Sequence, residues 1–153
     1  MNTTLFREYK FKFYLNANHF IIIEGKEGQI HPHTWEFMVN IRMDNEGFVQ
    51  FDQYEKAIDA YFEQYQNKLL NEISPFDHVV PTLENMSDHF IYDIREIVKK
   101  LGGMLVKMES SETPTRSYVI SFENDQDFVK QMQKNMDDKI STVIDNILDG
   151  IVE

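Results

Sequence analysis

Cysteine is absent from this chain of 153 residues, which excludes disulfides, thiolate metal ligands and a cysteine nucleophile. A metal site in this chain must therefore be built from histidine and carboxylate ligands. Proline and glycine are scarce, with four and six residues, and no Ser/Gly-rich linker interrupts the sequence. The length and the missing linker predict one domain.

Long apolar runs and an excess of positive charge are also missing. The longest apolar run, Phe20 to Ile23, is far shorter than the roughly 20 residues of a membrane span. The first residues, Met1 to Phe6, lack the layout of a signal peptide. Acidic residues outnumber basic ones by 26 to 15, which disfavours nucleic acid because phosphate binding relies on Lys and Arg. We therefore expect a cytoplasmic globular protein with no membrane or nucleic-acid partner.

Hydrophobic periodicity predicts the order of the secondary structure elements. Alternation of apolar and polar residues indicates strands, and apolar residues at spacings of three and four indicate helices. We first expect a strand over 9–17, a loop over 25–29, a strand over 33–43 and a turn over 44–47. A helix over 54–69, a break at Ser74-Pro75 and a second helix, capped by Thr82 and stopped by Gly102-Gly103, should follow. The chain should end with a strand over 104–108, a connection over 109–116, a strand over 117–122 and a helix from Phe128 to Ile151. Paired strands followed by paired helices favour an α+β fold with an antiparallel sheet.

Three histidines are placed to converge at one end of that sheet. His31 and His33 are two residues apart on a strand, so their side chains share a face, and His19 continues the apolar face of the first strand. Three neutral imidazoles with an open position form a catalytic zinc site. The alternative is that they are core or loop histidines that hydrogen-bond to the backbone.

Two further features carry possible chemistry. Asp77-His78 lies between the predicted helices, where the carboxylate could orient the imidazole for proton transfer, or else cap a helix beside a surface histidine. Glu112 lies before the last strand. A buried carboxylate there would accept two parallel donors from an amino-pyrimidine edge, whereas a solvated loop glutamate would have no such role.

The chain resembles the 6-pyruvoyl-tetrahydropterin synthase and 6-carboxytetrahydropterin synthase family. The resemblance rests on five ordered matches over about residues 6 to 122. They are Ala17-Asn18-His19, His31-Pro32-His33 with its aromatic strand, Phe76-Asp77-His78, Pro81-Thr82-Leu83-Glu84-Asn85, and Glu112-Thr113 followed by Tyr118.

The resemblance implies the tunnelling fold, in which subunits join their sheets into an oligomeric barrel, commonly a hexamer. It also implies that His19, His31 and His33 bind Zn²⁺, that Glu112, with Thr113 beside it, binds a pterin substrate, and that Asp77 and His78 transfer protons, across a subunit interface. On this basis residues 1–123 form the tunnelling-fold domain, and residues 124–153 form a C-terminal helical extension of it.

The chain departs from the family where its synthases carry a cysteine. That position, four residues before His31, holds Glu27, which is the candidate base, and Glu24 is a further candidate. The resemblance implies a zinc-dependent lyase acting on 7,8-dihydroneopterin triphosphate or a relative, like 6-carboxytetrahydropterin synthase on the route to deazaguanine nucleosides. The alternatives are a variant that uses glutamate to form 6-hydroxymethyl-dihydropterin, the formation of 6-pyruvoyl-tetrahydropterin, a pocket for a ligand that is not a pterin, and a non-catalytic zinc- or pterin-binding scaffold.

Overall fold

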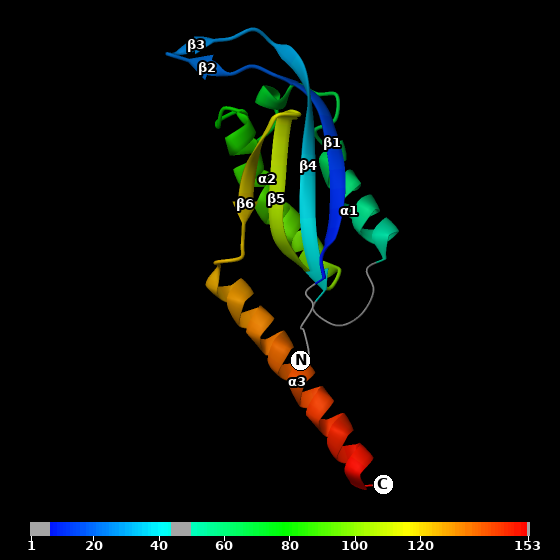
Figure 1. The fold of residues 1–153 in the computed structure, drawn as a ribbon. Helices are drawn as coiled ribbons and strands as arrows, with labels where there is room; N and C mark the ends of the chain where they lie inside the picture. The colour runs from blue at the N-terminus through cyan, green and yellow to red at the C-terminus, as the bar shows by residue number, and fades with distance from the viewer. Residues whose placement is uncertain (1–6, 44–49, 153) are drawn as a thin grey trace.

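The computed structural model describes residues 7–43 and 50–152, and the predicted turn over 44–47 lies outside them. One antiparallel sheet has the strand order β1-β4-β5-β6, and helices α1 and α2 cover one of its faces (Figure 1). The elements are β1 (Tyr9–His19), β2 (Ile22–Ile23), β3 (Lys26–Glu27), β4 (His31–Met43), α1 (Phe51–Glu63), the 3₁₀ turn η1 (Leu70–Glu72), α2 (Leu83–Lys100), β5 (Gly103–Thr113), β6 (Arg116–Ser121) and α3 (Gln126–Val152). The α+β prediction is confirmed.

Strands β1 and β4 form a long hairpin whose apolar sides face the helices. Leu15 pairs with Trp35 and His19 pairs with His31, so the alternating residues of both strands share one face. The side chains on that face are buried: Phe11, Phe13, Leu15, Ala17, Trp35, Phe37, Val39 and Ile41. The two strands therefore bring the predicted histidines to the same end of the sheet.

The connection between β1 and β4 is a small hairpin rather than the predicted loop. Ile23 pairs with Lys26 and Ile22 pairs with Glu27. The turn between them uses two left-handed residues, Glu24 with φ 52° and Gly25 with φ 77°, which matches the right-handed twist of a tight hairpin. The loop prediction is wrong for Lys26 and Glu27, because the two-residue turn lets the chain pair with itself.

Helix α1 ends at Glu63, and the predicted extension to Leu69 is wrong. The segment after the helix pairs with the outer edge of β1 instead. Asn67 donates its backbone N–H to the carbonyl of Asn16 at 2.6 Å, and Asn18 donates to the carbonyl of Lys68 at 2.9 Å. This covers the last part of a strand edge that would otherwise present unpaired backbone groups.

Helix α2 begins and ends as the sequence predicts. The Thr82 hydroxyl accepts the backbone N–H of Asn85 at 3.1 Å, which satisfies one of the free donors of the first turn. Gly102 follows the helix with φ 87°, a conformation that disfavours other residues. At Gly103, a Cβ atom would lie 2.7 Å from the Tyr54 hydroxyl, so glycine permits the close approach of β5 to α1.

Strand β5 is longer than predicted. It continues through Thr113, which pairs with Arg116, so only two residues remain for the turn. The predicted connection over 109–116 is therefore mostly strand. As a consequence, Glu112 lies in the sheet and not in a loop.

Helix α3 leaves the sheet at the end away from the β2–β3 hairpin (Figure 1). Asp125 accepts the backbone N–H of Phe128 at 3.1 Å, and the Phe128 side chain is buried against the core. Within the described ranges, none of the helices combines the length and the apolar character that a bilayer crossing requires.

Candidate metal centre

Three imidazoles meet where β1 ends and β4 begins. His19 is the last residue of β1, and His31 and His33 are the first and third residues of β4. One nitrogen from each ring lies within 4.8 Å of the others. The ring centroids are 4.5 to 5.0 Å apart. The sheet register therefore brings together the three histidines that the sequence singled out.

Backbone carbonyls orient two of the three rings. His19 Nδ1 lies 2.8 Å from the carbonyl oxygen of Pro81, just before α2, and His31 Nδ1 lies 2.9 Å from that of Gln29. A carbonyl only accepts, so these contacts assign the proton of each neutral ring to Nδ1. In this tautomer each Nε2 carries a lone pair. A carbonyl that fixes the tautomer and orientation of a ring in this way is a common second-shell feature of metal-binding histidines.

The two free nitrogens face each other. His19 Nε2 and His31 Nε2 are 2.9 Å apart. Two lone pairs at that distance repel unless a proton or a cation lies between them. The donor set therefore fits a metal ion, and Zn²⁺ accepts neutral histidine nitrogens at three positions with a fourth open.

Burial favours the neutral form of His19. Its side chain is 3% exposed, and desolvation lowers the pKa of the imidazole below its ordinary value, opposed by the Pro81 carbonyl and by the negative charge of Glu112. A neutral imidazole is the form that binds a metal.

Trp35 links the histidines to Glu112. The Trp35 side chain is fully buried and packs its ring against His19 and His33, with centroids 4.9 and 5.2 Å away. Its indole Nε1 donates to Glu112 Oε1 at 3.0 Å. Glu36 pairs with Ser111, so Trp35 and Glu112 are the next residues along the two strands. The carboxylate thus lies beside the histidines in a partly buried position.

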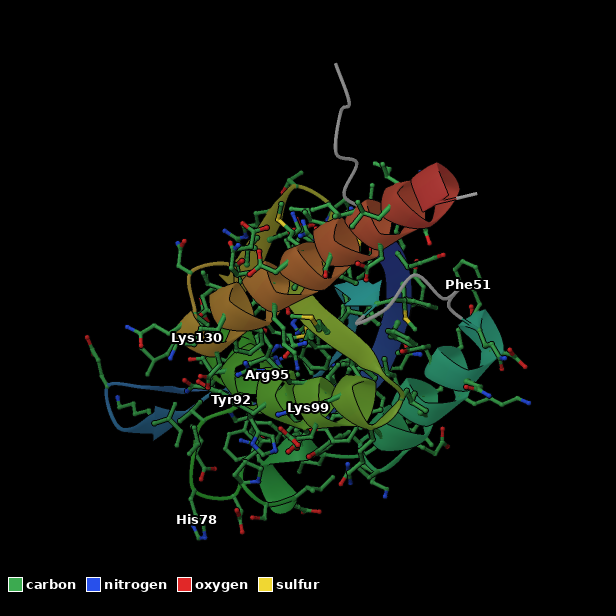
Figure 2. The ribbon with its side chains drawn as sticks, turned by 90° about the horizontal axis from the view of Figure 1, so that it is seen from below. Phe51, His78, Tyr92, Arg95, Lys99 and Lys130 are labelled. Atoms are coloured by element: carbon green, nitrogen blue, oxygen red, sulfur yellow. The ribbon has the colours of Figure 1, made fainter. Side chains whose placement is uncertain are left out.

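None of the other predicted residues joins the imidazole cluster or hydrogen-bonds to it in the described part of the chain. Glu27 is exposed on the β2–β3 hairpin. Asp77 and His78 are exposed in the segment before α2, and 3.7 Å separates His78 Nε2 from Asp77 Oδ2. Figure 2 shows His78 pointing outward, away from the body of the subunit. Thr113 is half-buried at the end of β5, where its hydroxyl lies 3.3 Å from that of Thr115.

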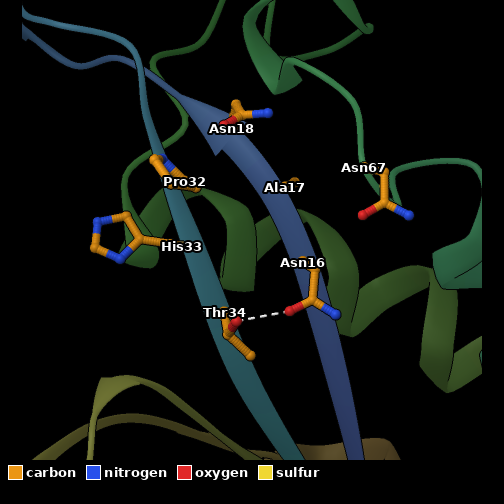
Figure 3. Close-up of a pocket in the computed structure, with 7 residues that line it drawn as sticks. All are labelled: Asn16, Ala17, Asn18, Pro32, His33, Thr34 and Asn67. Carbon is orange, nitrogen blue, oxygen red and sulfur yellow. Dashed lines mark hydrogen bonds between the residues drawn. The ribbon is translucent and has the colours of Figure 1, made fainter.

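A pocket of about 340 Å³ adjoins His33 (Figure 3). Seven residues line it: Asn16, Ala17, Asn18, Pro32, His33, Thr34 and Asn67. The Thr34 hydroxyl donates to the amide oxygen of Asn16 at 2.6 Å. Because Asn16 and Thr34 alternate with Ala17 and His33 along the paired strands, their side chains lie on the sheet face opposite the His33 ring. The polar groups of this pocket therefore do not face the imidazole cluster.

The groups that orient the site could not be predicted from sequence motifs. Carbonyl oxygens of Pro81 and Gln29 leave no trace in a motif, because any residue carries one. The Trp35 N–H had a signal, since a buried indole needs a hydrogen-bond partner. Glu112 can be identified as its partner only from the structure, in which β5 extends to that residue.

A family model described as 6-pyruvoyl tetrahydropterin synthase matches residues 8–124. No curated protein matches the chain in sequence. Among solved structures, the Caenorhabditis elegans 6-pyruvoyl tetrahydropterin synthase superposes with a TM-score of 0.65 and 16% identity, covering 79% of this chain and 99% of that chain. A Plasmodium vivax 6-pyruvoyltetrahydropterin synthase, solved as a catalytic-residue mutant with alanine for glutamate, gives 0.59 and 14%, covering 76% and 98%.

A Wolinella succinogenes protein described as uncharacterised gives a TM-score of 0.59 and 13% identity, covering 78% of this chain and 100% of that chain. These likenesses establish the tunnelling fold predicted from the sequence. The family match covers most of the chain and ends just before α3. The chain belongs to the 6-pyruvoyl tetrahydropterin synthase family, whose members process pterins.

Proposed function

We propose that the chain is a zinc-dependent lyase of the 6-carboxytetrahydropterin synthase type, acting on 7,8-dihydroneopterin triphosphate or a close relative. The observation that carries the proposal is the cluster of His19, His31 and His33, with two rings turned by carbonyls so that their Nε2 atoms face each other. These three residues would hold Zn²⁺. The ion, when bound, polarises oxygens on the substrate side chain and eases enolisation.

Glu112 would bind the pterin ring. One carboxylate oxygen accepts the Trp35 N–H, and the remaining acceptor capacity of the group can take the parallel donors of an amino-pyrimidine. Thr113, the next residue, would contribute to the same contact. The half-buried position next to the histidines supports this role, because it would hold the ring within reach of the metal.

Glu27 would act as the base in place of the missing cysteine. The Plasmodium vivax relative supports a glutamate in this role, since its catalytic-residue mutant carries alanine in place of a glutamate. Glu27 lies on the hairpin that joins β1 to β4, between His19 at the end of β1 and His31 at the start of β4. Glu24, at the turn of this hairpin, is the other candidate.

The use of glutamate also favours a second product. With glutamate as base, the alternative is a lyase that forms 6-hydroxymethyl-dihydropterin rather than the 6-carboxy product. Mass spectrometry of the products distinguishes these two, and it distinguishes both from 6-pyruvoyl-tetrahydropterin. A non-catalytic scaffold would release none of them, even with zinc bound.

Asp77 and His78 would transfer protons in the site of a neighbouring subunit. Their exposure, and the outward direction of His78, support this arrangement. The sheet supports it too, because in the described residues β6 pairs on one side only. Joining such edges would close the sheets into a barrel, with the hexamer as the expected assembly.

The experiment that tests the proposal is product analysis on zinc-loaded protein incubated with 7,8-dihydroneopterin triphosphate. We expect a new pterin from the parent chain. Glu27→Gln should lower turnover by about 100-fold or more, as expected for a lost general base, while zinc content stays unchanged. Glu24→Gln on the same hairpin tests the other candidate, and it should keep the turnover of the parent if Glu27 is the base. Equal turnover in Glu27→Gln and the parent would contradict the role of Glu27.

Trp35→Phe should weaken pterin binding without affecting zinc binding. The substitution keeps an aromatic ring beside the histidines but removes the N–H that orients Glu112. Since a hydrogen bond to a charged group contributes about 1.5–3 kcal/mol, we expect the Kd for a pterin ligand to rise by at least about tenfold. Isothermal titration with pterin and with Zn²⁺ measures both effects. An unchanged pterin Kd, or a parallel loss of zinc affinity, would contradict this role.

A further inference from the structure

Helix α3 presents an aliphatic surface that its own subunit leaves open. The start of the helix is anchored, because Phe128 is buried and Arg42 donates to the sulfur of Met132 at 3.7 Å. Farther along, five aliphatic side chains, here called the aliphatic stripe, are each 50 to 58% exposed: Ile140, Val143, Ile144, Ile147 and Leu148. Their spacings of three, one, three and one place them on one face of the helix.

The course of α3 explains why the stripe is open. The helix starts below β6 and extends past the end of the sheet, so its later turns lie beyond the body of the subunit (Figure 1). It has 27 residues, or about 40 Å at 1.5 Å per residue. A helix of this kind is stabilised mainly by packing of its apolar face, which a single subunit does not provide here.

We propose that α3 pairs in antiparallel orientation with α3 of a second copy of this chain. A stripe of Ile, Val and Leu at spacings of three and four is the surface that packs between two helices. The stripe residues of one copy expose on the order of 500 Å², so a pair would bury about 1,000 Å², the size at which specific interfaces begin. The inference goes beyond the proposed enzymatic function and does not depend on it.

The charge pattern disfavours a lipid surface as the occupant. Amphipathic helices that bind membranes carry Lys and Arg on their polar face to attract anionic lipids. From residue 140 to the end of α3 the sequence contains aspartates and no Lys or Arg, and the whole chain has a net charge of −11. A second helix of the same kind is the better match for the stripe.

The same pattern selects the antiparallel orientation. In the first half of α3 the exposed Lys130 and Lys134 are balanced by the exposed Asp127 and Asp137, whereas the second half exposes Asp145 and contains no Lys or Arg. A parallel pair would place the two acidic halves side by side. An antiparallel pair brings the acidic half of one copy next to the charge-balanced half of the other, which favours that arrangement. Val129, half exposed at the start of the helix, is then available to the end of the partner helix.

The charge pattern favours overlap of the two helices along their full length, which puts the two-fold axis near the middle of the helix and packs the stripe of each copy against the first half of the partner helix. Ile140 lies next to the midpoint of Gln126–Val152, so the two copies of Ile140 would meet at the axis. Ile147 lies seven residues farther along, and its two copies would be about 20 Å apart at 1.5 Å per residue. A disulfide requires Cα atoms within about 7 Å of each other, so it can report the difference.

Cysteine cross-linking of the full chain tests the proposal, because the chain has no cysteine of its own. Under mild oxidation, Ile140→Cys should give a covalent dimer as the main species on a non-reducing gel, and Ile147→Cys should remain monomeric. A monomeric Ile140→Cys would overturn the pairing. Dimer formation by Ile147→Cys equal to that by Ile140→Cys would overturn the antiparallel orientation.

A second pair of variants tests whether the stripe causes the contact. Added to Ile140→Cys, the changes Ile144→Lys and Ile147→Lys should reduce the cross-linked fraction by at least tenfold. The change Asn146→Lys adds a lysine on the other side of the helix and should leave the fraction within twofold. Equal cross-linking in both backgrounds would show random collision and overturn the proposal. Circular dichroism checks that α3 remains helical in each variant.

Discussion

Replacing His33 with alanine is expected to lower the zinc affinity of the chain by more than about 100-fold, because even outer-shell changes at metal sites cost 10- to 100-fold. His33 suits this test because it is half-buried, so its loss disturbs packing less than the loss of buried His19. Competition with a chelating dye measures the affinity. Thermal unfolding gives a second readout, since zinc at 100 times its Kd stabilises the parent by about 2.7 kcal/mol.

The matched controls are the two histidines outside the cluster. His78→Ala and His89→Ala should each keep one zinc per chain and the full thermal stabilisation by zinc. Retention of tight zinc binding in His33→Ala would contradict the three-histidine site. Loss of zinc in His78→Ala would mean that the ligand set has been drawn from the wrong residues.

Mixing two inactive variants is expected to restore activity. Asp77→Ala and His33→Ala should each lose nearly all turnover, since one lacks a proton-transfer group and the other a metal ligand. If each site takes its histidines from one subunit and Asp77 from a neighbour, random co-assembly rebuilds about one site in four. Dissociation and reassembly of equal amounts should therefore give about a quarter of the parent activity.

The control for this experiment mixes two variants of one group, Asp77→Ala with His78→Ala. Asp77 and His78 lie on the same chain, so neither variant carries an intact pair. No complete site can therefore form, and the mixture should stay inactive. Failure of the first mixture, with hexamers formed and zinc bound to half of the subunits, would place the whole site within one chain. That outcome would contradict the role proposed for the exposed pair.

Much of the sheet could be predicted from the sequence because its alternation is strict. The apolar sides of β1 and β4 are buried as expected, and the shared parity of His19, His31 and His33 correctly indicated that the three rings would meet. The cap of α2 at Thr82 also followed from local chemistry. In each case the determining interaction lies between residues close in sequence or paired across one hairpin.

Predictions failed where a distant segment competed for the backbone. The helical spacing up to Leu69 is real, but residues 66–69 pair with the edge of β1, about fifty positions earlier in the chain, and the helix stops. The extension of β5 through Glu112 was missed because a polar, serine-rich stretch does not reveal that a neighbouring strand will accept it. Tertiary pairing, absent from local patterns, decided both.

The contact between Trp35 and Glu112 shows the limit most clearly. The two residues are 77 positions apart, and their hydrogen bond depends on the register of β4 against β5. The sequence indicated Glu112 as a candidate ring-binding residue, both as a carboxylate that could accept two parallel donors and through the family resemblance, without indicating what orients it. The structure adds a physical reason for its orientation and a substitution that separates ring binding from metal binding.

The measurement that tests the central claim most directly compares the zinc-loaded and metal-free chain on 7,8-dihydroneopterin triphosphate, with products identified by mass. A zinc-dependent pterin lyase predicts a new pterin from the zinc-loaded chain, recovery of activity when zinc is returned to the metal-free chain, and no product from His33→Ala. Absence of any product from a fully zinc-loaded, hexameric chain would contradict the claim.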